Sequence, residues 1–152
     1  EHLSFGFGLY DGAASRHIHT GVHGPHTLDG DDLFFIGELD LKWAAGPQAL
    51  PGRVGLGGWG HNGTFETFAG KMQHGADGAY LTVDQMLWRE CGGAQDDPQG
   101  IGAFFQYGWV DEDVSEVTEH LGAGFSWTGM IPERDDDIAG LGANVVNRSH
   151  SE

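Results

Sequence analysis

Histidines near the start of the chain offer the most direct metal-binding chemistry in the sequence. His17 and His19 stand two residues apart, and His23 and His26 follow them. In an extended chain, two histidines at this spacing direct both imidazoles to one side, an arrangement that suits zinc or copper. No cysteine or carboxylate at a recognised spacing completes the set of ligands. The pattern indicates a solvated loop, with His17 and His19 as the candidate ligands if a metal binds.

Two acidic clusters offer oxygen atoms that could bind calcium. The first is the segment 29–32, and the second is Asp135, Asp136 and Asp137, directly after Arg134. Neither cluster has the residue spacing of an EF-hand loop. Aspartate in such a run commonly accepts backbone N–H bonds within a turn. We expect a structural turn at the second cluster, in which Arg134 offsets the acidic charges.

A pair of carboxylates raises the question of acid–base catalysis. Glu38 and Asp40 stand two residues apart, and Lys42 continues the same spacing. On a strand the two carboxylates share one side, with Cβ atoms about 6.5–7 Å apart. Glycosidases use a pair of carboxylates, but this spacing is common in strands and indicates no active site by itself. We expect no enzymatic activity and no cofactor.

The elements that position these residues follow from an alternation of apolar and polar positions. In the segment 33–43, Leu39 and Leu41 fall on the side opposite Glu38 and Asp40. A helix would scatter these charges around its circumference, whereas a strand gathers them on one side. The same alternation recurs along the chain and predicts seven strands, near residues 3–10, 33–43, 53–61, 78–90, 100–111, 118–130 and 137–147.

The connections between these strands are rich in Gly, Asp and Pro, and no segment has a helical period. Several expected strands reach about ten residues, longer than the five or six that are usual in globular sheets. That length suits a tilted strand that crosses a membrane. We expect residues 1–152 to form a single all-β unit of antiparallel, up-and-down strands.

Composition narrows the class of protein. The 152 residues include 27 glycines together with 9 Phe, 5 Trp and 3 Tyr. Collagen would require a strict triplet period, and a disordered chain would have few aromatic residues. The net charge of −16 argues against a nucleic-acid partner, because phosphates would be repelled. The single cysteine, Cys91, cannot form a disulfide within the chain, and no apolar run is long enough for a spanning helix.

Alternation alone does not say which face is covered. A soluble sandwich buries its apolar face against a second sheet, whereas a membrane barrel turns that face to lipid and its polar face to the lumen. Glycines on the polar side favour the barrel, and so do aromatic residues towards strand ends. The alternatives are a soluble antiparallel β-sandwich or cupin-like domain that binds metal through the His-rich loop, and a structural β protein that conducts nothing. The aromatic residues concerned are Trp43, Trp88, Tyr107, Trp109 and Trp127.

Three stretches of the later sequence resemble the carbohydrate-selective porins of Gram-negative outer membranes, the OprB type. They are YLTVDQMLWRE from Tyr80, GIGAFFQYGWVDED, and HLGAGFSWTGMIPERDDDIAGLGANVV. SFGFGLYDGAA and GDDLFFIGELDL are similar to earlier strands of that family, more loosely. The segments 16–26 and 62–77 resemble it least. The resemblance covers most of the chain and is most specific over 79–147.

The resemblance implies an outer-membrane barrel of about sixteen antiparallel strands, within the range of such barrels. It also implies passive uptake of glucose and other small neutral sugars, contact with outer-membrane lipid, frequent assembly as a homotrimer, and no catalysis or cofactor. Seven strands cannot close such a barrel, so we expect the chain to be an internal-to-late piece of a longer porin in a bacterial outer membrane.

The residues expected to line the pore follow from the same alternation. Sugars carry many hydroxyl groups and present C–H faces, so a lumen that suits them mixes hydrogen-bonding groups with aromatic surface. Charged side chains on the wall also tune what passes. The positions on the polar face that fit this description are Glu38, Asp40, Lys42, Thr82, Asp84, Phe104, Gln106, Ser126 and Asn144.

Overall fold

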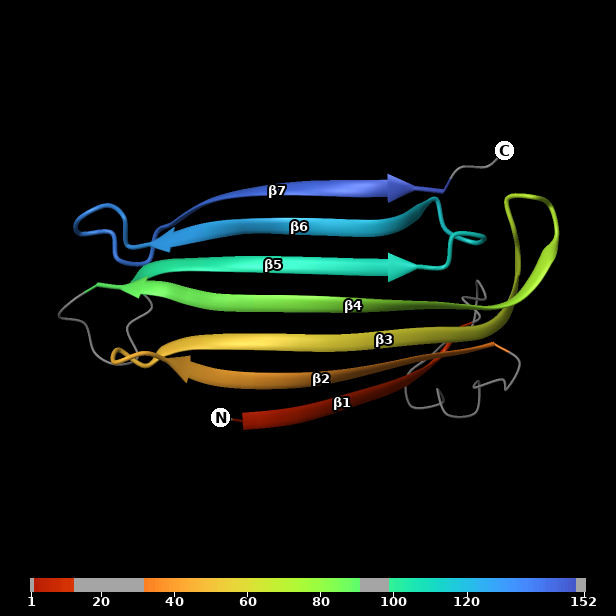
Figure 1. Ribbon diagram of the computed structural model, residues 1–152, viewed down its shortest axis with the longest axis horizontal. Coiled ribbons are helices and arrows are strands. Elements are labelled where there is room, and N and C mark those ends of the chain that lie inside the picture. Colours follow the sequence, from red (N-terminus) through yellow and green to blue (C-terminus); the bar gives the residue numbers. More distant parts are fainter. Residues whose placement is uncertain (1, 13–31, 91–98, 150–152) are drawn as a thin grey trace.

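The chain folds into one antiparallel sheet. The computed structural model describes residues 2–12, 32–90 and 99–149, and every element in them is a strand. Each strand pairs with its neighbours in the sequence, so the sheet order follows the chain order (Figure 1). The expected all-β, up-and-down meander is confirmed. The strands are β1 His2–Asp11, β2 Leu33–Ala45, β3 Leu50–Glu66, β4 Met72–Arg89, β5 Gly100–Val110, β6 Val117–Thr128 and β7 Ile138–Arg148.

β3 and β4 are longer than the alternation predicted. The segments 53–61 and 78–90 were expected, but the pairing of the two strands continues to Glu66 and Met72. A β-bulge between His61 and Thr64 shifts the register there, and such a bulge breaks the period of two. The alternation therefore stopped at the bulge, whereas the backbone hydrogen bonds continue past it.

The extended β3–β4 hairpin reaches beyond the neighbouring strands and curves back towards the β5–β6 turn (Figure 1). Two contacts hold it there. The Phe68 backbone N–H donates to the Asp113 carbonyl at 3.3 Å, and Gln73 Nε2 donates to Asp111 Oδ2 at 2.6 Å. Gly75 in this hairpin has a φ of +87°, a backbone conformation that residues with a Cβ atom rarely adopt.

At the opposite end, the β2–β3 connection is shorter than the sequence predicted. Residues 44–52 were expected to be a connection, but only 46–49 form the turn. The Ala49 N–H donates to the Gly46 carbonyl at 3.1 Å, and both residues have positive φ. Pro51 is compatible with strand pairing near a strand end, where one missing N–H costs little.

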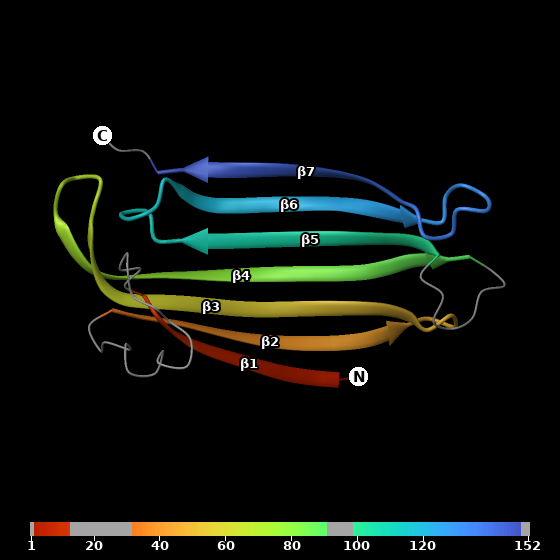
Figure 2. The same cartoon turned by 180° about the vertical axis from the view of Figure 1, so that it is seen from behind.

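Among the residues that the structure describes, no second layer covers either face of the sheet, as the views from both sides show (Figure 2). In the described part of the chain, Ala76 is the one buried apolar residue. Phe5 is 72 % exposed and Leu141 68 %. The β-sandwich alternative is wrong for these residues, because a sandwich buries one face of each sheet against another sheet. Over the same residues, no helix is long and apolar enough to cross a membrane.

The register gives the sheet two chemically different faces. Across the middle of the sheet, neighbouring strands pair residue by residue without a register shift. Apolar positions of one strand therefore lie beside apolar positions of the next, and polar positions beside polar or glycine positions. One central row on the apolar face is Phe5, Leu39, Leu56, Leu81, Tyr107, Leu121 and Val145. The adjacent row on the polar face is Ser4, Asp40, Gly55, Thr82, Gln106, Gly122 and Asn144.

Tryptophans mark the ends of the strands on the apolar face. Trp43, Trp88 and Trp127 lie near the C-terminal ends of β2, β4 and β6, which are all at the same end of the sheet. The rings of Trp88 and Trp127 meet edge to face, with centroids 6.4 Å apart. Trp43 Nε1 donates to Gln85 Oε1 at 2.8 Å. An apolar ring with a bonded polar tip is what the boundary between lipid and water favours.

The exposed apolar face predicts how this chain behaves alone. In water it should aggregate, because β1 and β7 each have one strand partner in the described sheet and unpaired edges recruit other chains. Detergent micelles should reduce the aggregation by covering the apolar face. Sedimentation of the purified 152-residue chain with and without detergent measures this. A stable monomer in plain buffer would contradict it.

Candidate functional site

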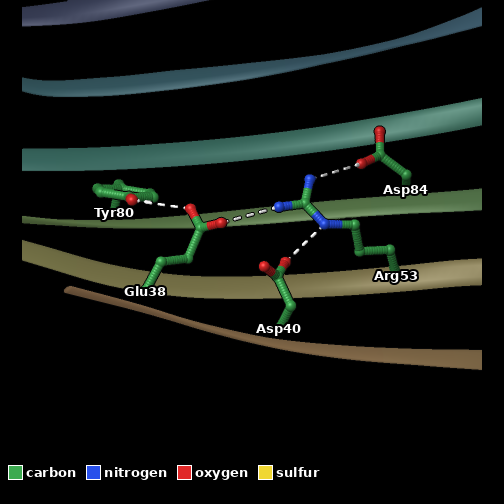
Figure 3. Close-up of polar contacts among 5 residues, drawn as sticks. All are labelled: Glu38, Asp40, Arg53, Tyr80 and Asp84. Carbon is green, nitrogen blue, oxygen red and sulfur yellow. Dashed lines mark hydrogen bonds and ion pairs between the residues drawn. The ribbon is translucent and has the colours of Figure 1, made fainter. Parts of the chain in front are cut away.

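One arginine gathers three carboxylates on the polar face. Arg53 on β3 donates from Nε to Asp40 Oδ1 at 2.6 Å and from Nη2 to Glu38 Oε1 at 3.0 Å, both on β2. Its Nη1 atom lies 3.9 Å from Asp84 Oδ2 on β4 (Figure 3). Tyr80 joins through Glu38. We call Glu38, Asp40, Arg53, Tyr80 and Asp84 the Arg53 cluster.

Glycines on β3 make this convergence possible. The Tyr80 hydroxyl donates to Glu38 Oε2 at 2.8 Å, and a Cβ on Gly57 would collide with the Tyr80 ring. A Cβ on Gly55 would lie 3.0 Å from Asp40 Oδ1. Side chains of β2 and β4 therefore meet above β3, because β3 itself contributes only backbone at these two positions.

The Arg53 cluster is accessible and carries excess negative charge. The exposed fraction of the side chains runs from 17 % at Asp40 to 58 % at Asp84. The cluster's three carboxylates and one guanidinium give a net charge of −2, which the neighbouring Lys42, the register partner of Arg53, reduces to −1. Ion pairs this exposed contribute little to stability. Their larger effect is on the field that a dissolved solute meets at this surface.

The other residues predicted for the polar face lie at different distances from this cluster. Thr82 and Gln106 share a row with Asp40, and Thr82 Oγ1 lies over Gly55 together with Asp40 and Arg53. Phe104 and Ser126 border an open depression of about 450 Å³, which Lys42, Arg53 and Asp84 also line. The Phe104 ring lies over Gly124, where a Cβ would be 2.7 Å from Cε1. Asn144 lies on β7, at the far edge of the sheet.

Sequence reasoning missed Arg53 and Tyr80, although a signal for both existed. Arg53 alternates with Val54, and Tyr80 with Leu81, so period two already placed both on the polar face. The glycine-rich β3 offered too few side chains to make that assignment. The contact itself could not be predicted, because it depends on the β2–β3 register that brings Lys42 beside Arg53.

A second polar cluster lies on the apolar face, near the start of β6. Glu119 accepts hydrogen bonds from the Tyr107 hydroxyl at 2.9 Å and from Asn147 Nδ2 at 2.6 Å. Alternation identified the apolar positions around it but not this cluster. The two donors satisfy the carboxylate, which lowers the cost of placing a charge on an otherwise apolar face.

The acidic turn has a local organisation. Arg134 Nη2 lies 2.6 Å from Asp137 Oδ2, and the Asp137 N–H donates to the Arg134 carbonyl at 3.2 Å. Asp135 and Asp136 form no ion pair among the residues that the structure describes.

The histidine candidates for a metal site, His17 and His19, lie outside the described residues. Within the described ranges, no group of three or more His, Cys, Asp or Glu side chains could hold a metal ion.

The Arg53 cluster yields a stability prediction. Arg53→Gln should destabilise the full-length protein by no more than about 1 kcal/mol, because its ion pairs are exposed to solvent, although the change leaves Glu38 and Asp40 facing each other without a cation between them. Lys42→Gln is the matched control, since Lys42 is the neighbour on the same face and forms no ion pair among the described residues. Urea unfolding of the protein in lipid vesicles measures both. Equal effects of the two substitutions would contradict the prediction.

Comparison with known proteins places the chain in a family. The model of the carbohydrate-selective porin, OprB family, matches residues 2–152. The high-pH structure of Pseudomonas putida OprB shares the fold, with a TM-score of 0.67 at 17 % sequence identity over 85 % of this chain. This chain spans 34 % of that protein. A search of curated proteins found no match. Because the family model covers nearly every residue, the chain belongs to the carbohydrate-selective porin family, OprB.

Proposed function

We propose that the protein containing this chain is an outer-membrane porin that admits small neutral carbohydrates such as glucose by passive diffusion. The observation that carries the proposal is the pair of unlike faces on a single uncovered sheet, in a chain of the carbohydrate-selective porin family. The proposal assigns no catalysis and no cofactor. Assembly as a homotrimer stays an expectation from the family resemblance.

In this proposal the apolar face contacts lipid. Its central rows consist mainly of Leu, Phe and Val side chains, together with Tyr107 and two alanines, and tryptophans lie towards the strand ends. In a membrane barrel, apolar residues form a band around the outside and aromatic residues border that band. Each inner strand pairs with a neighbour on both sides, so its regularly paired backbone groups are bonded as the interior of a bilayer requires of a spanning segment.

The polar face lines the water-filled passage. The Arg53 cluster supplies carboxylate acceptors, guanidinium N–H donors and one tyrosine hydroxyl within reach of a solute. Gln106 and Ser126 add neutral groups on the same face. A sugar exchanges its bonds to water for bonds to such groups, so it can enter without a large cost of desolvation. We assign the expected pore-lining residues to this role.

Direct measurement of uptake tests the function. Vesicles that contain the full-length protein should swell in iso-osmotic glucose faster than vesicles without it. They should swell slowly in a trisaccharide, because a passage narrow enough to select sugars excludes larger solutes. No swelling with glucose from a correctly folded preparation would contradict the proposal.

The facing of the sheet yields a second prediction. Leu39→Arg should destabilise the full-length protein in lipid vesicles by roughly 2–4 kcal/mol, the cost of a cation near the bilayer midplane. Asn144→Arg is the control, because Asn144 shares the Asp40 row on the polar face, and it should cost far less. Urea unfolding measures both, and a reversed order of the two costs would refute the assigned facing.

The net charge of the Arg53 cluster yields a third prediction. Asp84→Asn removes one negative charge and should lower the preference of the channel for cations over anions. Asp84 is the most exposed partner of Arg53, and its ion pair is the longest, so the fold should tolerate the change. The reversal potential of a bilayer under a KCl gradient measures the preference. Asp135→Asn, in the turn at the sheet end, should leave it nearly unchanged; an equal shift would count against the assignment.

A further inference from the structure

Aromatic rings form a continuous series on the polar face, towards the end of the sheet where the β3–β4 hairpin lies. The ring centroids of Tyr10 and Phe34 are 6.1 Å apart, and those of Phe34 and Trp59 are 5.8 Å apart. The ring centroids of Phe34 and His61 are 6.4 Å apart. We call Tyr10, Phe34, Trp59 and His61 the aromatic track.

The track belongs to the face of the Arg53 cluster and not to the tryptophans near the lipid boundary. Trp59 and Arg53 are six residues apart on β3, an even number, so the strand places them on the same face. Phe34 and Glu38 have the same relation on β2. Aromatic residues on the apolar face are accounted for by lipid, but lipid does not account for rings on the opposite face.

Trp59 has the geometry of a platform. Its register partner on β4 is Gly78, and a Cβ there would lie 2.6 Å from Trp59 Nε1 and Cε2. The indole therefore lies across the backbone of β4 instead of standing away from the sheet. The ring remains partly exposed, so a second flat apolar surface can pack on it.

An unused hydrogen-bonding group lies on the platform itself. Trp59 Nε1 donates to no acceptor among the described residues. Gly57 precedes Trp59 by two residues on β3, about 6.5–7 Å away along the strand. Tyr80 and Glu38 are its register partners. A solute on the indole would thus lie about two residues along the strand from Tyr80 and Glu38, which are polar groups of the Arg53 cluster.

We propose that the aromatic track is a binding site for carbohydrate rings, at which a sugar stacks through its C–H face before it passes to the Arg53 cluster. This rests on the proposed function. A pyranose has an apolar face and a rim of hydroxyl groups, and the track offers flat aromatic surface with an indole N–H donor at its edge. Linear alcohols of equal polarity lack that face and would gain less from the rings.

The test uses full-length protein in planar bilayers, with glucose as the probe. Trp59→Ala should raise the glucose concentration for half-maximal block of the ion current by about three- to tenfold, the loss of one aromatic contact. Trp59→Phe, which keeps a ring, should restore most of the affinity. Trp109→Ala, on the opposite face, is the matched control and should change nothing. Conductance in KCl alone should stay similar in all variants.

The outcomes separate this inference from the function on which it rests. If the unaltered protein binds and passes glucose while Trp59→Ala leaves half-maximal block unchanged, the track is not a sugar site, and the porin function stands. A change in KCl conductance that parallels the loss of sugar block would assign Trp59 a structural role and overturn the inference. If the folded, conducting protein passes no glucose, the proposed function fails first.

Discussion

The register between strands is the constraint on which this structure depends. Each strand has a period of two, but a face exists only because neighbouring strands align their periods across the sheet. A slip by one residue would turn every side chain of a strand to the other face. If β2 slipped in this way, Leu39 would take the place of Asp40 on the polar face, and Arg53 would lose its carboxylate partners on that strand.

Glycine lets this sheet carry large side chains on a closely spaced wall. Gly57 accommodates Tyr80, and Gly78 accommodates Trp59. In each pair a ring from one strand lies over bare backbone of the next, which protects that backbone from competing contacts and fixes the ring. The abundance of glycine therefore reflects packing across strands on the polar face more than turns. The same arrangement brings the carboxylates of β2 to Arg53.

Much of the fold could be predicted from the sequence because local alternation decides it. The segment around Leu39 and Asp40 predicted a strand with one charged side, and the structure places both as expected. The ends of β3 and β4 could not be predicted, since a bulge near His61 breaks the period. The Arg53 cluster needed the register as well as the period, and the register results from the pairing of whole strands. The aromatic track was missed for the same reason.

The facing of the sheet is the central claim, and adjacent residues on β5 test it most directly. Phe105 lies on the apolar face and Gln106 on the polar face, at the same depth along the strand. Each is replaced by cysteine in full-length protein whose Cys91 is changed to Ser, and the protein is reconstituted in lipid bilayers. A membrane-impermeant thiol reagent should label position 106 and reduce the single-channel current, and it should leave position 105 unlabelled. Equal labelling of the two positions, or labelling at 105 alone, would contradict the account.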